Sequence, residues 1–289
     1  MTIQHYFEIL IYLLIPVFIY QLTFEKKQIR LFFLISFLYW TIIEHSFLSL
    51  TRLYEYKNYL IWFSGLPIYI PLAWMYLFFY GYQIYKNNSH YFSKKGKIYT
   101  ATFISLFILT YDFLIDLFAV KIWLWEWIGL NPEEQFFWIY YYNYLWWFFS
   151  VFILFFFYLK NHNDLKKVFI NSIITYFLAL CGSFYLLDVK SETLNSIYIQ
   201  NLFLFLIFLF KTYTYVRLIT FKNNYTLSFM LSTLLINLSL VYFTYEFVNH
   251  NFVIFFAIYS LILYVILFIV SIKVYIEKRK NNELQEVIV

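Results

Sequence analysis

Residues 98–119 read IYTATFISLFILTYDFLIDLFA, an apolar stretch that contains only two charged side chains, Asp112 and Asp116. A helix needs about 20 mostly apolar residues to cross the hydrocarbon core of a bilayer. This stretch has that length, and lysines stand just outside both of its ends, at positions 97 and 121. It therefore predicts a transmembrane helix that carries two carboxyl groups near one end.

Similar stretches recur along the whole chain, separated by short polar connections. The sequence predicts an all-α fold, a polytopic transmembrane helix bundle of about nine spans. The expected spans are 6–24, 31–50, 59–85, 98–119, 136–159, 168–187, 196–220, 226–247 and 252–275. Of the 289 residues, 63% are hydrophobic and 13% are charged, whereas soluble domains carry about 25% charged residues. This composition excludes an ordinary soluble domain and a nucleic-acid-binding surface.

The lysines and arginines of the connections predict the orientation of the bundle. Of the 21 basic residues, sixteen fall in the odd-numbered connections and the C-terminal tail, and four fall in the even-numbered connections. Because basic residues gather on the cytoplasmic side of membrane proteins, we expect the N-terminus outside and the C-terminus in the cytoplasm. We expect one transmembrane domain over 1–275, with no secretory signal, and a charged cytoplasmic tail over 276–289.

Ionisable side chains inside the predicted spans point to a functional site, because they are costly to bury in a bilayer. With this orientation Glu44, Asp112, Asp116, Glu246 and the amide of Asn143 all fall at one depth, in the outer half of the bundle. The two aspartates are four residues apart, so they project from one helix face about 5–6 Å apart. Two like charges repel strongly there, so we expect one carboxyl group to stay protonated as an acid beside an ionised base.

Other interpretations of these charged residues stay open. Asp112 and Asp116 would also suit a helix end that reaches water, and Glu44 would suit a hydrogen-bonded contact between helices. Lys211 suggests a Schiff base to retinal, but we expect it at the cytoplasmic end, where its long side chain reaches water. The histidines lie at different depths, and the one cysteine, Cys181, cannot form an internal disulfide. We therefore expect no metal site and no cofactor.

Residues 121–135, KIWLWEWIGLNPEEQ, form an unusual connection on the outer side. They place Trp123, Trp125 and Trp127 at alternate positions. The indoles would form either an aromatic belt at the membrane surface or a re-entrant lid above the acidic groups.

The preceding outer connection and the span after it carry further aromatic residues. Tyr54 and Tyr56 lie in that connection, and Trp74 lies in the third span, which begins in the outer half of the bundle. Pro67 and Pro71 also fall in that half, where proline would free backbone carbonyl groups and kink the helix. Aromatic rings, kinks and acidic groups are therefore all expected in one region.

Two segments together resemble a known family. One is Glu44 followed by residues 53–74, LYEYKNYLIWFSGLPIYIPLAW, and the other is residues 111–127, YDFLIDLFAVKIWLWEW, followed by NYLWWF at 143–148. This order is similar to the carotenoid biosynthesis membrane protein family that includes bisanhydrobacterioruberin hydratase, a carotenoid 1,2-hydratase. That family shows a Glu before a Y-x-Y pair, a G-V-P stretch leading to an apolar span with Trp, and D-x3-D before W-x-W.

The resemblance implies an integral enzyme of the prokaryotic plasma membrane that adds water to the terminal C=C bond of an acyclic carotenoid. Asp112 or Asp116 would protonate the alkene and Glu44 would orient or deprotonate the water. The residues expected to bind the substrate are Tyr54, Tyr56, Trp74, Trp123, Trp125 and Asn143. The expected partners are a carotenoid or isoprenoid substrate, membrane lipid and other carotenoid-pathway membrane enzymes, and not nucleic acid.

Three alternatives to hydration remain. Residues 131–137, NPEEQFF, resemble the P-x-E-E motif of membrane lycopene cyclases, and cyclisation begins with the same protonation step. An isoprenoid transporter or binding protein would use the same acidic groups for proton coupling. A structural subunit would pair them with a partner protein.

Overall fold

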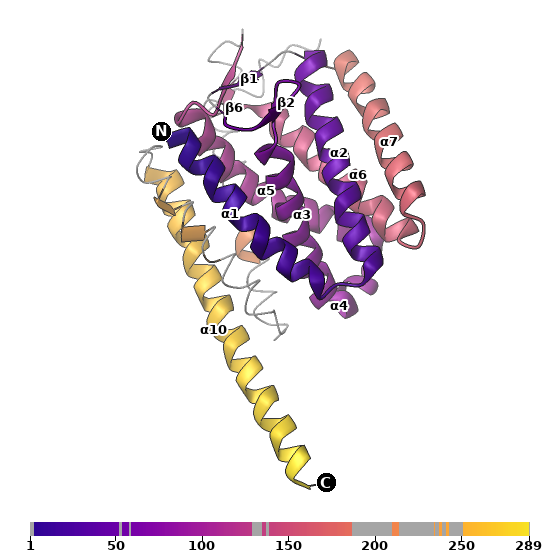
Figure 1. Ribbon diagram of the computed structural model, residues 1–289, viewed down its shortest axis with the longest axis vertical. Helices are drawn as coiled ribbons and strands as arrows, with labels where there is room; N and C mark the ends of the chain where they lie inside the picture. The colour runs from indigo at the N-terminus through magenta and orange to yellow at the C-terminus, as the bar shows by residue number, and fades with distance from the viewer. Residues whose placement is uncertain are drawn as a thin grey trace.

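The structure is a computed structural model that describes residues 3–51, 54–57, 59–128, 135–136, 139–186, 210–213, 234, 237–238, 241–242 and 251–288. These residues are mostly helical, and three two-stranded sheets lie near one end (Figure 1). The helices are α1 (Ile3–Thr23), α2 (Lys27–Thr51), α3 (Tyr69–Asn87), α4 (Ser89–Ser93), α5 (Lys97–Lys121), α6 (Tyr141–Asn161), α7 (Leu165–Leu186) and α10 (Asn251–Ile288). The strands are β1 (Tyr54–Tyr56), β2 (Trp62–Phe63), β3 (Leu66–Pro67), β4 (Trp125–Trp127), β5 (Gln135–Phe136) and β6 (Ile139–Tyr140).

Among the described residues, five helices contain an apolar segment long enough to cross a membrane, namely α1, α2, α5, α6 and α10. Helices α3 and α7 have 19 and 22 residues and belong to the same bundle. The predicted helical architecture, with several helices long and apolar enough to cross a membrane, is therefore confirmed. The seventh and eighth predicted spans, 196–220 and 226–247, lie mostly outside the described residues, and so does Glu246.

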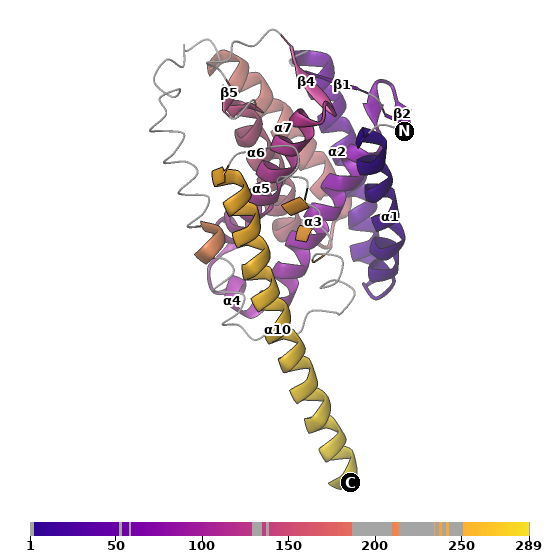
Figure 2. The same ribbon diagram turned by 90° about the vertical axis from the view of Figure 1, so that its left-hand side faces the viewer.

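The strands mark one end of the bundle, which we call the strand end, and α4 marks the opposite end (Figures 1 and 2). Helices α2 and α5 run toward the strand end, whereas α1, α3 and α6 run away from it. This alternation brings the C-terminal turns of α2 and α5 next to the N-terminal turn of α6. Helix α10 extends beyond the bundle on the side of α4 (Figure 2).

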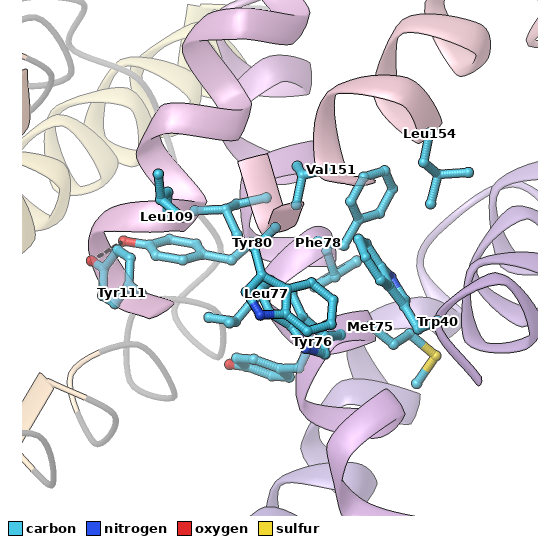
Figure 3. Packing of buried hydrophobic residues seen from close by; sticks show 14 of the residues in the cluster. Trp40, Met75, Tyr76, Leu77, Phe78, Tyr80, Leu109, Tyr111, Val151 and Leu154 are labelled. Atoms are coloured by element: carbon cyan, nitrogen blue, oxygen red, sulfur yellow. Dashed lines mark hydrogen bonds between the residues drawn. The ribbon is translucent and has the colours of Figure 1, made fainter. Parts of the chain in front are cut away.

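Helix α5 forms the centre of the core, because most of its side chains are buried against α3 and α6. Large side chains such as Trp40, Phe78 and Tyr111 fill the space between α2, α3, α5 and α6 (Figure 3). Gly81 lets α3 approach α5 closely, since a Cβ atom there would lie 2.7 Å from Cγ2 of Ile104. The tight packing around α5 gives its two aspartates fixed neighbours.

The third predicted span, 59–85, is helical only from Tyr69. Residues before it form the β2–β3 hairpin, because Ser64 (φ 51°) and Gly65 (φ 82°) reverse the chain direction. Pro67 ends β3, and Pro71 lies in the first turn of α3, where a missing N–H costs no helical hydrogen bond. The predicted helix kink at these prolines is therefore wrong.

Two other boundaries also differ from the prediction. The fifth predicted span, 136–159, becomes helical at Tyr141, after the short β5–β6 hairpin. The ninth, 252–275, continues through the predicted tail as one helix that ends at Ile288. Lysine, glutamate and glutamine are good helix formers, so this polar segment extends the helix.

Candidate active site

A cavity at the strand end gathers most of the predicted site residues. Glu44 from α2, Asp112 and Asp116 from α5 and Asn143 from α6 all line it. Each of the three carboxyl groups belongs to a residue that is at most 3% exposed. The cavity has a volume of about 60 Å³, and one water molecule needs about 10–15 Å³ on this scale. It therefore has room for a few water molecules or for the tip of a branched chain.

Glu44 is held by phenol groups from the connection that follows α2. The hydroxyl of Tyr54 donates to Oε2 of Glu44 at 2.7 Å, and the hydroxyl of Tyr56 donates to the same oxygen at 3.2 Å. Burial, followed by the nearby Glu44 charge, raises the pKa of both tyrosines well above the ordinary value. Both phenols therefore keep their protons and remain donors. The indole of Trp74 also interacts with this carboxyl group.

These tyrosines belong to a small antiparallel ribbon, β1–β4, which pairs Tyr54 with Trp127 and Tyr56 with Trp125. Side chains alternate across a strand, so these four aromatic residues share one face, and all four line the cavity. The opposite face carries Glu55 and Glu126, and Lys57 bridges them at 2.8 and 2.6 Å. The ribbon is thus a lid with an aromatic inner face and a charged outer face. This geometry favours the lid over the aromatic belt for Trp125 and Trp127.

Asp116 is bound by a short chain of donors from α6. The Nδ2 atom of Asn143 donates to Oδ2 of Asp116, and the Nε1 atom of Trp147 donates to Oδ1 of Asn143 at 2.9 Å. An indole N–H is a donor only, so Asn143 must present its oxygen to Trp147 and its NH₂ group to Asp116. Asp112 has a different environment, because its Oδ2 atom is buried without a hydrogen-bond partner among the described residues.

Indoles from three helices stack in the bundle beside these groups. The ring of Trp74 lies 5.2 Å from Trp40 and 4.2 Å from Trp147, with interplanar angles of 24° and 27°. Trp74 and Trp147 line the cavity. The indole of Trp74 interacts with Glu44, and the indole of Trp147 donates to Asn143. The stack therefore fixes the positions of Glu44 and Asn143 relative to one another.

Trp123 does not join this cavity, although the alternate spacing of the tryptophans predicts that it would. Its side chain is 59% exposed, and its backbone has a φ of 59°. Leu124 N–H donates to the carbonyl of Ala119, and Trp123 N–H donates to that of Val120, which is the pattern of a Schellman helix end. Trp123 occupies the left-handed position of this motif, so the strand-like alternation begins only after it.

Several residues in or near the site are absent from the predicted set of catalytic and substrate-binding residues. Trp127, Trp147 and Tyr69 line the cavity, and the Tyr69 hydroxyl is buried without a partner in the described part of the chain. The buried carboxylate of Glu8 accepts hydrogen bonds from the backbone N–H groups of Leu60 and Ile61. Glu8 is an acid inside a predicted span, so the criterion that selected Glu44 would also have found it.

Lys211 is fully buried, with Nζ 4.4 Å from the centre of the Tyr111 ring. The prediction that it reaches water at the end of its span is therefore wrong. Within the described residues, no three His, Cys, Asp or Glu side chains lie together as a metal site would require. No lysine or arginine is among the described residues that line the cavity. Residues 131–134, with the two glutamates of the cyclase-like motif, lie outside the described residues.

The chain matches no protein-family model, no curated protein and no solved structure.

Proposed function

We propose that the chain is a membrane-embedded enzyme that adds water to the terminal C=C bond of an acyclic carotenoid without a redox cofactor. The observation that carries this proposal is a buried carboxyl oxygen of Asp112 that has no partner among the described residues and belongs to an aromatic-walled cavity. Hydration of an isolated alkene needs a strong acid positioned at carbon, with water close by. This cavity offers a candidate for the acid and space for the water.

Asp112 is the proton donor in this proposal. Asp116 accepts a hydrogen bond from Asn143, whose orientation is fixed by Trp147, and such donors favour the ionised form of a carboxyl group. Oδ2 of Asp112 has no such donor within the described part of the chain and is buried, which favours the neutral form. In the proposed mechanism, the two buried carboxyl groups on successive turns of α5 take different protonation states.

The proposed reaction adds one proton and one hydroxyl group across the double bond. Asp112 transfers its proton to the less substituted alkene carbon, and the tertiary carbon becomes a cation. A water molecule oriented by Glu44 forms a C–O bond to that carbon. The proton released from this water passes to a carboxylate of the cluster and returns to Asp112, so the enzyme is regenerated. The product is a tertiary alcohol.

The aromatic wall suits the cationic intermediate. Trp125, Trp127, Trp74 and the two ribbon tyrosines line the cavity, and an aromatic face stabilises a desolvated cation by about 2 kcal/mol. The cavity is too small for a whole polyene, so only the chain end enters it and the remainder stays in lipid. This geometry matches a reaction at the terminal double bond.

The proposal includes the membrane orientation predicted from the basic residues. With nine spans and the N-terminus outside, the strand end faces the non-cytoplasmic side of a prokaryotic plasma membrane. Two features support an odd number of spans with the chain ends on opposite sides: the described helices alternate in direction, and the chain ends lie at opposite ends of the molecule (Figure 2). The excess of basic residues in the odd-numbered connections supports the choice of the non-cytoplasmic side for the strand end.

Pigment extraction from a lycopene-producing bacterial host that expresses the chain tests this function. We expect a hydroxylated acyclic product from the wild type, and a loss of about 10²–10⁴-fold for Asp112→Asn, as is typical when a general acid is removed. Glu126→Gln, on the outer face of the lid, is the matched control and should retain activity. A ring-bearing product would favour cyclisation. Unchanged pigment with correctly inserted wild-type protein would favour the transporter or structural alternatives.

A further inference from the structure

The β2–β3 hairpin exposes a continuous apolar tip at the strand end. Its residues Leu60, Ile61, Trp62 and Phe63 are all exposed, with values of 60% for Trp62 and 66% for Phe63. Four consecutive exposed apolar side chains are unfavourable in water and mark a contact surface. We call these four residues the hairpin tip.

Several backbone groups of the hairpin tip form hydrogen bonds inside the protein. Glu8 accepts from the N–H groups of Leu60 at 2.6 Å and Ile61 at 3.1 Å, and the N–H of Ile68 donates to the carbonyl of Ile61 at 3.1 Å. The two strands pair through Trp62 with Pro67 and through Phe63 with Leu66. Satisfied backbone groups are what a non-helical segment needs when it lies in an apolar environment. The buried Glu8 of α1 thus stabilises the start of this hairpin.

The surrounding sequence favours a position of the hairpin beside lipid. No charged residue occurs between Lys57 and Lys86, a run that includes both the hairpin and α3. Helix α3 has 19 residues, which gives about 28 Å at 1.5 Å per residue and nearly spans the hydrocarbon layer of about 30 Å. A helix of this length that crosses the layer would place the hairpin at its boundary. The neighbouring β1–β4 lid presents Glu55, Lys57 and Glu126 outward instead.

We propose that the hairpin tip inserts into the lipid of the leaflet at the strand end, beside the cavity that the lid covers. Tyr69 and Ile70 follow the hairpin directly and line the cavity, together with Phe7 and Ile11 of α1. The strand end then has two distinct surfaces: a charged lid for water and an apolar hairpin for acyl chains. An apolar chain end that leaves the bilayer at the hairpin meets the apolar side of the cavity.

Site-specific fluorescence tests this insertion in the full chain, independently of any enzymatic activity. The chain has one cysteine, Cys181, so Cys181→Ser provides a background for single cysteines. Phe63→Cys is labelled with an environment-sensitive fluorophore and reconstituted in phosphatidylcholine vesicles. Glu55→Cys on the lid is the water-exposed control, and Leu13→Cys, 65% exposed on α1, is the lipid-facing control.

We expect the label at position 63 to behave like that at position 13. Its emission should be blue-shifted, and it should be quenched by nitroxide-bearing lipids but not by aqueous iodide. Iodide quenching as strong as at position 55 would overturn the proposal. Protection from both quenchers would also overturn it, because the tip would then be covered by protein, such as a second copy of the chain. The labelled side chain is exposed, so its replacement leaves the packed core unchanged.

Discussion

Asn143 determines how the two aspartates of α5 differ, because its amide is fixed between Trp147 and Asp116. The carboxylic acid C=O stretch in the infrared spectrum should therefore come from Asp112. We predict that Asp112→Asn removes a protonated carboxyl band that shifts in D₂O, whereas Asp116→Asn leaves that band in place. Infrared difference spectra of the purified variants measure this. A band that survives in Asp112→Asn and disappears in Asp116→Asn would reverse the two roles.

A second prediction at the residue scale separates two tryptophans that alternate along the chain. Trp125 is 8% exposed and lines the cavity, whereas Trp123 is 59% exposed at the end of α5. We predict that Trp125→Leu lowers the proposed hydration by about 10-fold or more, since a cation–π interaction with the carbocation would be worth about 2 kcal/mol. Trp123→Leu should retain wild-type activity. Product yield per inserted protein in the pigment assay gives the comparison, and equal losses would show that the site extends beyond the lid.

At the scale of elements, the β1–β4 lid is stabilised from inside the cavity. Tyr54 and Tyr56 attach it to Glu44, and its strands are too short to form a stable ribbon alone. We predict that Tyr54→Phe increases the amide hydrogen exchange of residues 54–57 and 124–127 by about 10- to 100-fold, because a hydrogen bond to a charged group contributes about 1.5–3 kcal/mol.

The control for the lid is Tyr59→Phe, because Tyr59 contacts Trp62 in the hairpin segment and is not part of the ribbon. That variant should leave exchange in the lid unchanged. If Tyr54→Phe also left it unchanged, the lid would be held mainly by other contacts, such as the ion pairs of Lys57 with Glu55 and Glu126.

The strands were the elements that the sequence analysis did not anticipate. Hydropathy alone treats residues 59–68 as the beginning of a helix, since the segment is apolar and uncharged. The segment forms a hairpin instead, because the chain turns at Ser64 and Gly65 and because buried Glu8 accepts a hydrogen bond from its backbone. In contrast, the expected ranges 6–24, 31–50, 98–119 and 168–187 agree closely with α1, α2, α5 and α7, because long apolar runs leave few alternatives.

At the scale of the whole molecule, the depth of each residue in the predicted bundle indicated the site better than the local spacing of residues did. The alternation of basic connections placed Glu44, Asp112, Asp116 and Asn143 at one depth, and the structure brings all four to one cavity. Depth does not specify the direction of a side chain around its helix. This is why Trp147, which faces the cavity from α6, was missed and Trp123, which turns outward, was included.

The same orientation makes a prediction for the intact cell. If the strand end is non-cytoplasmic, a cysteine on the lid must react with a membrane-impermeant maleimide added outside, and a cysteine near α4 must not. In the Cys181→Ser background, we predict that Glu55→Cys is labelled in intact spheroplasts and that Lys94→Cys is labelled only after the membrane is permeabilised. Both positions are exposed, so access to the reagent and not burial decides the result. The reverse pattern would place the acidic cavity on the cytoplasmic side, and the proposed hydration would then occur in the inner leaflet.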